Sequence, residues 1–393
     1  MYRLWPNKSR LEVARIIAVI VLVTATIFVF YFWRLGSLTA GLGPAEVNAR
    51  LSSSSLSLIA NDLSYAPHKV LQYAATTLIG DSALVLRSIS VVFAIVFLFC
   101  FFGLVKSWFG KTISFFATLL LSATPWFILL ARSAGPEILL LAPIAVLASY
   151  YWLTRSKRLF AWIALIVSSG LAVYLPGGLI LILIGIIAAR HGLKQAIQSF
   201  NLPQKILSSI AMLIIFAPIV YSASIDLGNL MPLFLIPSDW LSIWATVKSA
   251  AWNVLSLFWR TPQHSDFIVG RLPMFDGSLI ILSLFGGYAL FRLAKSKLYP
   301  LAGILIFGIL ASTISRQLVL LTLVMPVIAI FAAAGLRYLY MEWRSVFPKN
   351  PLPKYMALAL ISLLIAVHLY YGLRYSQAAW PNTTETRSTF VLK

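Results

Sequence analysis

Long apolar stretches separated by short polar segments run through almost the whole chain. Most are close to the roughly 20 residues that a helix needs to cross a bilayer, so the pattern predicts an all-α polytopic membrane protein. We expect a single bundle of about eleven transmembrane helices. The stretches fall at 16–34, 87–105, 112–131, 138–154, 159–172, 177–189, 206–222, 277–293, 298–314, 317–340 and 355–374.

The composition supports a membrane location. Of the 393 residues, 60% are apolar and 11% are charged, which is too apolar for a soluble domain of this length. A net charge of +20 would suit a nucleic-acid-binding protein, but the basic residues lie between apolar stretches instead of gathering on one face or arm. The single cysteine, Cys100, leaves no intrachain disulfide and no thiol-based zinc site.

The ends of two stretches allow more than one interpretation. The basic N-terminus followed by the apolar run 16–33 resembles a signal sequence, but the run is long enough to span, so we expect an uncleaved anchor. The fifth and sixth stretches are short and meet at Tyr-Leu-Pro-Gly-Gly, residues 174–178. This junction suits either a tight turn between two spans or a broken re-entrant pair.

The basic residues also predict an orientation. If the N-terminus is cytoplasmic, 19 Lys and Arg residues face the cytoplasm with only two acids, Glu12 and Glu342. The outside then holds 12 basic and nine acidic residues. The excess of basic residues in cytoplasmic loops therefore favours this orientation.

Two long loops, 35–86 and 223–276, then lie outside the cytoplasm, and we expect the chemistry there, on short amphipathic helices. No soluble C-terminal domain is expected within residues 1–393. The second loop carries Trp240, Trp244, Trp252 and Trp259 at spacings that fit one helical stripe, typical of a helix lying in the membrane interface. An aromatic belt without a specific ligand is the alternative.

Two acids in the extracytoplasmic segments are candidates for catalysis. Glu46 follows the first apolar stretch, and Glu137 immediately precedes the fourth. A carboxylate placed there can act as a general base that takes a proton from a reacting group. Each acid also has an ordinary explanation as a loop or helix-start residue, since Glu137 follows Pro136 and would suit a helix N-terminus.

Cationic side chains on the outside form the second set of candidates. Arg316 lies in a link of almost no length between two stretches, where it could bind a phosphate bidentately or extend its side chain to lipid headgroups. His68 could bind a substrate phosphate or a metal, although a lone loop histidine usually does neither. The candidates among the cations predicted outside are Lys69, Arg132, Arg260, Arg271 and Arg316.

Several short motifs occur in an order that resembles the membrane-embedded GT-C glycosyltransferases, in particular the protein O-mannosyltransferase and aminoarabinose transferase superfamily. The resemblance covers most of the chain and is densest over residues 41–154. The motifs are the acid after the first span, Pro67-His68-Lys69, Gly80-Asp81-Ser82, Leu86-Arg87-Ser88, Phe109-Gly110-Lys111, Ala123-Thr124-Pro125, the stretch from Arg132 to Glu137, Leu272 to Gly277, Leu284 to Gly287, and Arg316 followed by Pro326.

The resemblance implies an enzyme that transfers a sugar from a polyprenyl-phosphate donor to an extracytoplasmic lipid, glycan or protein acceptor, with inversion. It implies Glu46 as the catalytic base and Glu137 as a second acid. The donor phosphate would be held by Arg132, Arg271, Arg316 and Lys69. The chain departs from the family in having Glu46 followed by Val47, where many members carry an Asp-Glu pair. This leaves a divalent metal possible but not required.

Two functions from other classes stay open. A secondary transporter usually shows two related halves and ionisable residues near the membrane midplane, whereas this chain shows no such repeat and keeps nearly all its acids near the surface. A noncatalytic partner of an envelope-assembly enzyme would differ from the enzyme only in not needing Glu46. The sequence does not specify the donor sugar or the acceptor.

Overall fold

The structure is a computed structural model, and it describes residues 21, 23–156, 159–237, 239–261, 267–346 and 351–392. Over these residues the chain is helical, and its only strand-like feature is an isolated antiparallel bridge between Leu42 and Leu392. The chain has the expected all-α, multi-pass membrane architecture.

Seven helical segments of the described chain are long and apolar enough to cross a membrane, and a bent pair could form an eighth span. All eleven predicted stretches are helical where described, but three of the helices are shorter, so the number of crossings stays a prediction. The seven segments are α5 (Ala83–Phe109), Pro136–Ser156 with α8 (Ala142–Ser156), α10 (Gly178–Gln198), α11 (Leu202–Ile225), α14 (Lys295–Ser315), Leu318–Val346 with α15 (Met325–Val346), and Tyr355–Asn382, which begins within α16 (Pro351–Arg374). The three shorter helices are Val23–Phe32, α9 (Leu159–Val173) and α13 (Gly277–Leu293).

The stretch predicted at 112–131 is a broken helix. It consists of α6 (Lys111–Ala123) and α7 (Pro125–Ala131), which meet at an angle of 70°. Proline disfavours the helical conformation in the residue before it, and Thr124 accordingly adopts an extended backbone conformation. The bend directs α7 into the interior, where all seven of its residues are buried, and it ends beside Arg132.

Residues 174–178 form a tight turn between two helices. Helix α9 ends at Val173, and α10 begins at Gly178 after Gly177 adopts a left-handed conformation with φ of 70°. The amide of Gly178 donates to the carbonyl of Leu175. Whether α9 and α10 are two spans or a re-entrant pair stays a prediction.

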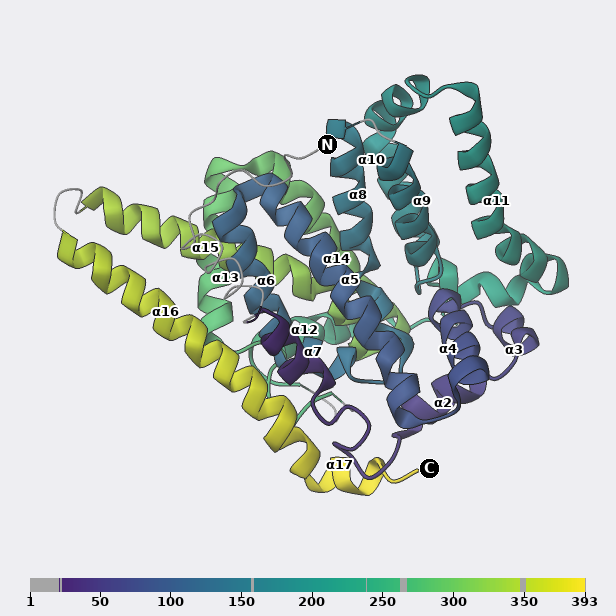
Figure 1. Cartoon of the computed structure of the whole chain (residues 1–393), viewed down its shortest axis with the longest axis horizontal. Coiled ribbons are helices and arrows are strands. Elements are labelled where there is room, and N and C mark those ends of the chain that lie inside the picture. The colour runs from purple at the N-terminus through teal and green to yellow at the C-terminus, as the bar shows by residue number, and fades with distance from the viewer. Residues whose placement is uncertain are drawn as a thin grey trace, which may run out of the picture.

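The two long loops carry helices at one end of the bundle. The first loop contains α2 (Pro44–Ser52), α3 (Leu56–Asn61) and α4 (Ala66–Ile79). These helices lie with α17 (Thr384–Thr389) at the lower end of the molecule in Figure 1, whereas the turn between α10 and α11 lies at the opposite end. The polar surface of the first loop is thus separated from the other end of the bundle by the length of the apolar helices.

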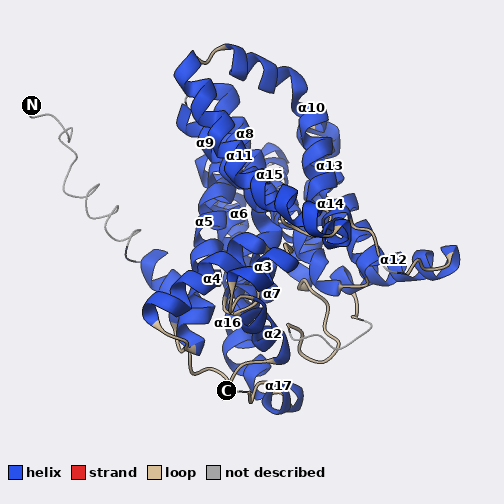
Figure 2. Ribbon diagram, turned by 90° about the vertical axis from the view of Figure 1, so that its right-hand side faces the viewer, coloured by secondary structure: helices blue, strands red, loops and turns tan. Residues whose placement is uncertain are grey.

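The tryptophans of the second loop do not share one helix. The prediction of a single helical stripe is therefore wrong for Trp240 and Trp259, which lie outside the helix. Helix α12 (Ile243–Phe258) contains Trp244 and Trp252, while Ser242 caps its start and leaves Trp240 before it, and Trp259 follows its end. The side chains of Trp240, Trp244 and Trp259 are more than 70% exposed. Helix α12 extends away from the bundle in Figure 2. Its place in the membrane interface remains a prediction.

Candidate active site

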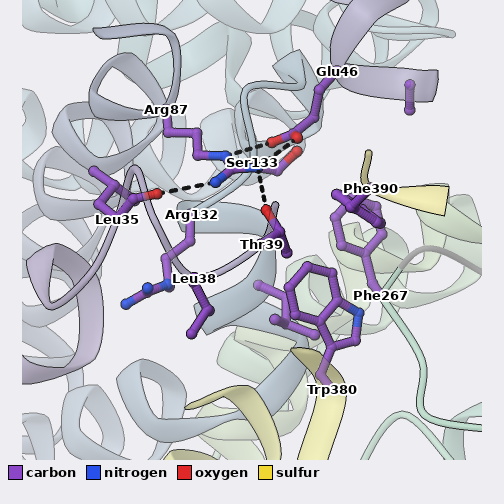
Figure 3. A pocket seen from close by; sticks show the side chains of 12 residues that line it. Leu35, Leu38, Thr39, Glu46, Arg87, Arg132, Ser133, Phe267, Trp380 and Phe390 are labelled. Atoms are coloured by element: carbon purple, nitrogen blue, oxygen red, sulfur yellow. Dashed lines mark hydrogen bonds and ion pairs between the residues drawn. The ribbon is translucent and has the colours of Figure 1, made fainter. Parts of the chain in front are cut away.

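A pocket of about 440 Å³, including its open mouth, lies beside the first loop. It is shown in Figure 3, with Glu46, Arg87 and Arg132 on one side and three aromatic rings on another. The polar side chains come from α2, from α5 and from the end of α7. Segments distant in sequence therefore build one site with a charged wall and an aromatic wall.

Glu46 is a buried carboxylate whose two oxygens are both occupied. Its side chain forms a two-point ion pair with Arg87, at 2.9 Å from Nε to Oε1 and 2.8 Å from Nη2 to Oε2. The amide of Ala134 donates to Oε1 at 2.8 Å, and the amide of Gly43 donates to Oε2 at 3.1 Å. Glu46 and Arg87 are only 2% and 3% exposed. In this arrangement Glu46 holds the site together and has no free oxygen for a proton.

Arg87 is the functional residue that the sequence analysis missed. Besides pairing with Glu46, its guanidinium donates to the carbonyls of Leu35 and Gly41 and to the hydroxyl of Thr39, at 3.0 to 3.1 Å. It thereby ties the segment after the first apolar helix to α5. The motif Leu86-Arg87-Ser88 contained a signal, because an arginine within a predicted span needs a partner.

Arg132 is a second buried guanidinium, but it has no acidic partner. It is 5% exposed, and it donates to the backbone carbonyls of Phe30 at 3.1 Å and Trp33 at 2.7 Å. No carboxylate in the described part of the chain is within ion-pair distance of it. Burial, followed by the nearby charges of Arg87 and Arg34, lowers the pKa of Arg132 to about 10, so it remains protonated at neutral pH. A cation of this kind favours an anionic ligand in the pocket.

Glu137 lies just after the turn that begins at Arg132, but it does not line this pocket. It belongs to the first turn of the 3₁₀ helix Pro136–Leu141, is partly buried, and folds back against Gly135. Its negative charge, after burial, contributes to raising the pKa of Tyr65 well above the usual value. Glu46 and Glu137 are therefore not a pair of carboxylates facing one pocket.

His68 is a neutral core histidine that supports this turn. Its Nε2 lies 3.0 Å from the hydroxyl of Ser90, which itself donates to the carbonyl of Gly135. Because the only proton of the Ser90 hydroxyl is used there, His68 Nε2 must be the donor, and Nδ1 carries a lone pair. Burial, with the charge of Lys69, lowers the pKa of His68 to about 3. No group of three His, Cys, Asp or Glu residues that could hold a metal occurs among the described residues.

The remaining predicted phosphate ligands lie outside the pocket. Lys69 is buried and paired with Asp62, at 2.6 Å to the carboxylate, so its charge is already compensated. Arg316 is exposed at the end of α14, where it adopts a left-handed conformation and donates to the carbonyl of Asp239. Arg271 is also exposed. The structure thus brings Arg132 to Glu46, but it does not bring Arg271, Arg316 or Lys69 into the same pocket.

The aromatic wall comes largely from the C-terminal segment, which the sequence analysis also missed. Trp380 and Phe390 form an edge-to-face pair with ring centroids 5.0 Å apart, and Phe267 completes the wall. Leu42 and Leu392 exchange two backbone hydrogen bonds, of 2.7 and 3.2 Å. No sequence pattern predicted this pairing.

Comparison with known proteins agrees with the fold. Residues 68–221 match the sequence model of the family described as dolichyl-phosphate-mannose-protein mannosyltransferase. No curated protein matches the chain in sequence. The crystal structure of ArnT from Cupriavidus metallidurans in the apo state is similar with a TM-score of 0.55 and 17% identity, over 96% of this chain and 76% of that one.

Two further solved structures are similar over most of this chain. ArnT from Cupriavidus metallidurans bound to undecaprenyl phosphate has a TM-score of 0.53 and 17% identity, over 95% of this chain and 76% of that chain. The archaeal oligosaccharyltransferase AglB from Archaeoglobus fulgidus, in complex with an inhibitory peptide and a dolichol-phosphate, has a TM-score of 0.56 and 14% identity. That match covers 94% of this chain and 57% of AglB.

The chain has the fold of the GT-C membrane glycosyltransferases. The resemblance to the protein O-mannosyltransferase and aminoarabinose transferase superfamily is confirmed, because the family match and the fold similarity point to the same group. At these identities the solved structures establish the fold alone.

Proposed function

We propose that the chain transfers a sugar from a polyprenyl-phosphate carrier to an extracytoplasmic acceptor. The observation that carries the proposal is Arg132, a buried cation that lines a pocket and is bonded only to carbonyl oxygens. A guanidinium can bind two phosphate oxygens at once, which makes a lipid phosphate a suitable ligand. The similarity to a structure that holds undecaprenyl phosphate supports the same ligand class.

In the proposed reaction, the acceptor oxygen attacks the anomeric carbon, and the bond to the phosphate oxygen breaks with inversion. The leaving polyprenyl phosphate takes the electron pair, and Arg132 stabilises its charge. Glu46 takes the acceptor proton. Since both Glu46 oxygens are occupied, the acceptor hydroxyl must first displace one of their donors, which are two N–H groups of Arg87 and the amides of Ala134 and Gly43. Substrate binding would thus convert a paired carboxylate into a base.

The fully paired state of Glu46 supports a second candidate, a noncatalytic relative that binds lipid phosphate. Such a protein would need Arg132 for binding but would need no free carboxylate. A transfer assay with a series of polyprenyl-phosphate sugars separates the two functions, because only the enzyme consumes the donor. A parent protein that binds the carrier lipid but shows no transfer with any of these donors would support the noncatalytic function.

We further propose that the first loop faces away from the cytoplasm. A cysteine at Ser54, which is exposed beyond α2, should be labelled from outside intact cells when Cys100 is replaced by Ala. A cysteine at the exposed Gln198, at the far end of α10, is the matched control and should label only after permeabilisation. The reverse result would invert the orientation.

The phosphate proposal predicts that Arg132→Lys weakens binding of undecaprenyl phosphate. Lysine keeps the charge but loses the planar group that binds two oxygens, so the affinity should fall by about 10- to 100-fold. Binding can be measured with the purified protein in detergent, alongside its unfolding midpoint. Unchanged affinity in a well-folded variant would remove Arg132 from the phosphate site.

Arg271 and Arg316 provide comparisons for the same measurement. Both are exposed, and neither lines the pocket, so Arg271→Ala measures the loss of a cation outside it. Arg316→Lys and Arg316→Ala test the sequence-based prediction that Arg316 binds the donor phosphate. A loss for Arg316 as large as that for Arg132 would show that the lipid phosphate reaches the end of α14.

A further inference from the structure

The pocket has two walls of different chemistry, and only the charged wall is used by the proposed phosphate contact. The aromatic wall consists of Trp380, Phe390 and Phe267, which line the same pocket as Arg132. Figure 3 shows the rings together on one side, with the Arg132 guanidinium directed away from them. Trp380 and Phe390 are only 7% and 6% exposed, yet both line the pocket. Two large aromatic side chains held beside a buried cation suit a ligand with an anionic group and an apolar face.

The aromatic wall is fixed in place by the first loop. The ring of Phe390 lies so close to Gly43 that a Cβ atom there would be 2.7 Å from it. A Cβ atom at Gly41 would clash with the carbonyl oxygen of Leu392. Glycine at both positions therefore permits the C-terminal segment to dock. Since the amide of Gly43 also donates to Glu46, one short segment positions the aromatic wall and the acid together.

A sugar attached to a phosphate has the chemistry that this pocket requires. A pyranose ring has hydroxyl groups around its rim and an apolar face made of C–H groups, and such a face packs well on aromatic rings. With the phosphate at Arg132, the attached sugar would enter the pocket that these rings also line.

We propose that Trp380 and Phe390 form a sugar-binding wall, through which the C-terminal segment selects the glycosylated carrier over the bare carrier. The proposal rests on the proposed function, since it assigns the sugar to the pocket whose phosphate contact is Arg132. Trp380 and Phe390 contact the sugar ring and take no part in proton transfer. They should therefore affect the affinity for the sugar and leave the phosphate contact unchanged.

The test compares the binding of two probes, undecaprenyl phosphate mannose and undecaprenyl phosphate, to the full-length protein. Trp380→Ala should weaken binding of the mannosylated lipid by about 10-fold and change binding of the bare lipid by less than about 2-fold. Trp380→Phe should restore most of the loss. Val391→Ala, at an exposed neighbour that does not line the pocket, should leave both affinities unchanged.

Phe390→Leu provides a second variant in case Trp380→Ala does not fold, because leucine keeps an apolar side chain against Gly43. It should show the same selective loss for the mannosylated lipid. Equal losses for both lipids would show that these residues only support the fold, and unchanged affinity in both variants would show that they do not contact the sugar. Undecaprenyl phosphate glucose is measured as well. A parent that binds neither sugar lipid more tightly than the bare lipid would contradict the sugar-binding role of the wall and leave the phosphate site standing. A parent that binds no lipid overturns the proposed function itself.

Discussion

Arg87→Ala should destabilise the folded protein by about 3 to 5 kcal/mol, the usual cost of removing one partner from a buried ion pair. The variant leaves the Glu46 carboxylate, which is 2% exposed in the parent, without its ion-pair partner and with two backbone amides as its remaining donors. It also removes the donors to Leu35, Thr39 and Gly41. The unfolding midpoint of the purified protein in detergent measures the effect.

A double variant shows whether the pairing itself causes the loss. Glu46→Gln combined with Arg87→Met removes both charges, while the glutamine oxygen can still accept from the Ala134 amide. This double variant should be more stable than Arg87→Ala, because no buried charge is left without a partner. Arg271→Ala, at an exposed arginine, should barely change the midpoint. An Arg87→Ala protein as stable as the parent would show that Glu46 does not depend on the pair.

The helical architecture could be predicted because it depends on local information. Apolar runs of sufficient length must satisfy their backbone hydrogen bonds internally in a membrane, so each run predicts a helix wherever it lies in the chain. Apolar runs do not predict where a helix breaks within them. The run 112–131 predicted one continuous stretch, whereas the chain bends by 70° at Thr124, before Pro125, where α7 packs into the interior. Likewise, Ser242 ends the tryptophan pattern because it starts α12.

The site was predictable only in part because its contacts are distant in sequence. Glu46 and Arg132 could be selected as charged residues near the predicted membrane surface, and the structure places both at one pocket. The partner of Glu46 lies 41 residues away, and nothing near Glu46 identifies Arg87 among the other cations. The contact between Leu42 and Leu392 joins the two ends of the described chain, so no periodicity could reveal it.

Glu46→Gln should reduce sugar transfer by about 100-fold or more while undecaprenyl phosphate still binds. Glutamine keeps the shape of the side chain and can still accept from Arg87 or Ala134, but it cannot take the acceptor proton. The effect should therefore appear in kcat and not in lipid affinity. Because this variant also loses the ion pair with Arg87, the assay must be run well below its unfolding midpoint.

Glu137→Gln is the matched control, since it removes the other candidate acid without touching the pocket. It should cost less than about 10-fold in transfer, because Glu137 can act on the reaction only through the turn that holds Arg132 and Ala134. If Glu46→Gln transfers sugar at the parent rate while Glu137→Gln is inactive, then Glu137 is the base, and the pairing of Glu46 with Arg87 is purely structural. If both variants keep full activity, neither carboxylate deprotonates the acceptor, and the proposed role of Glu46 as the base is wrong.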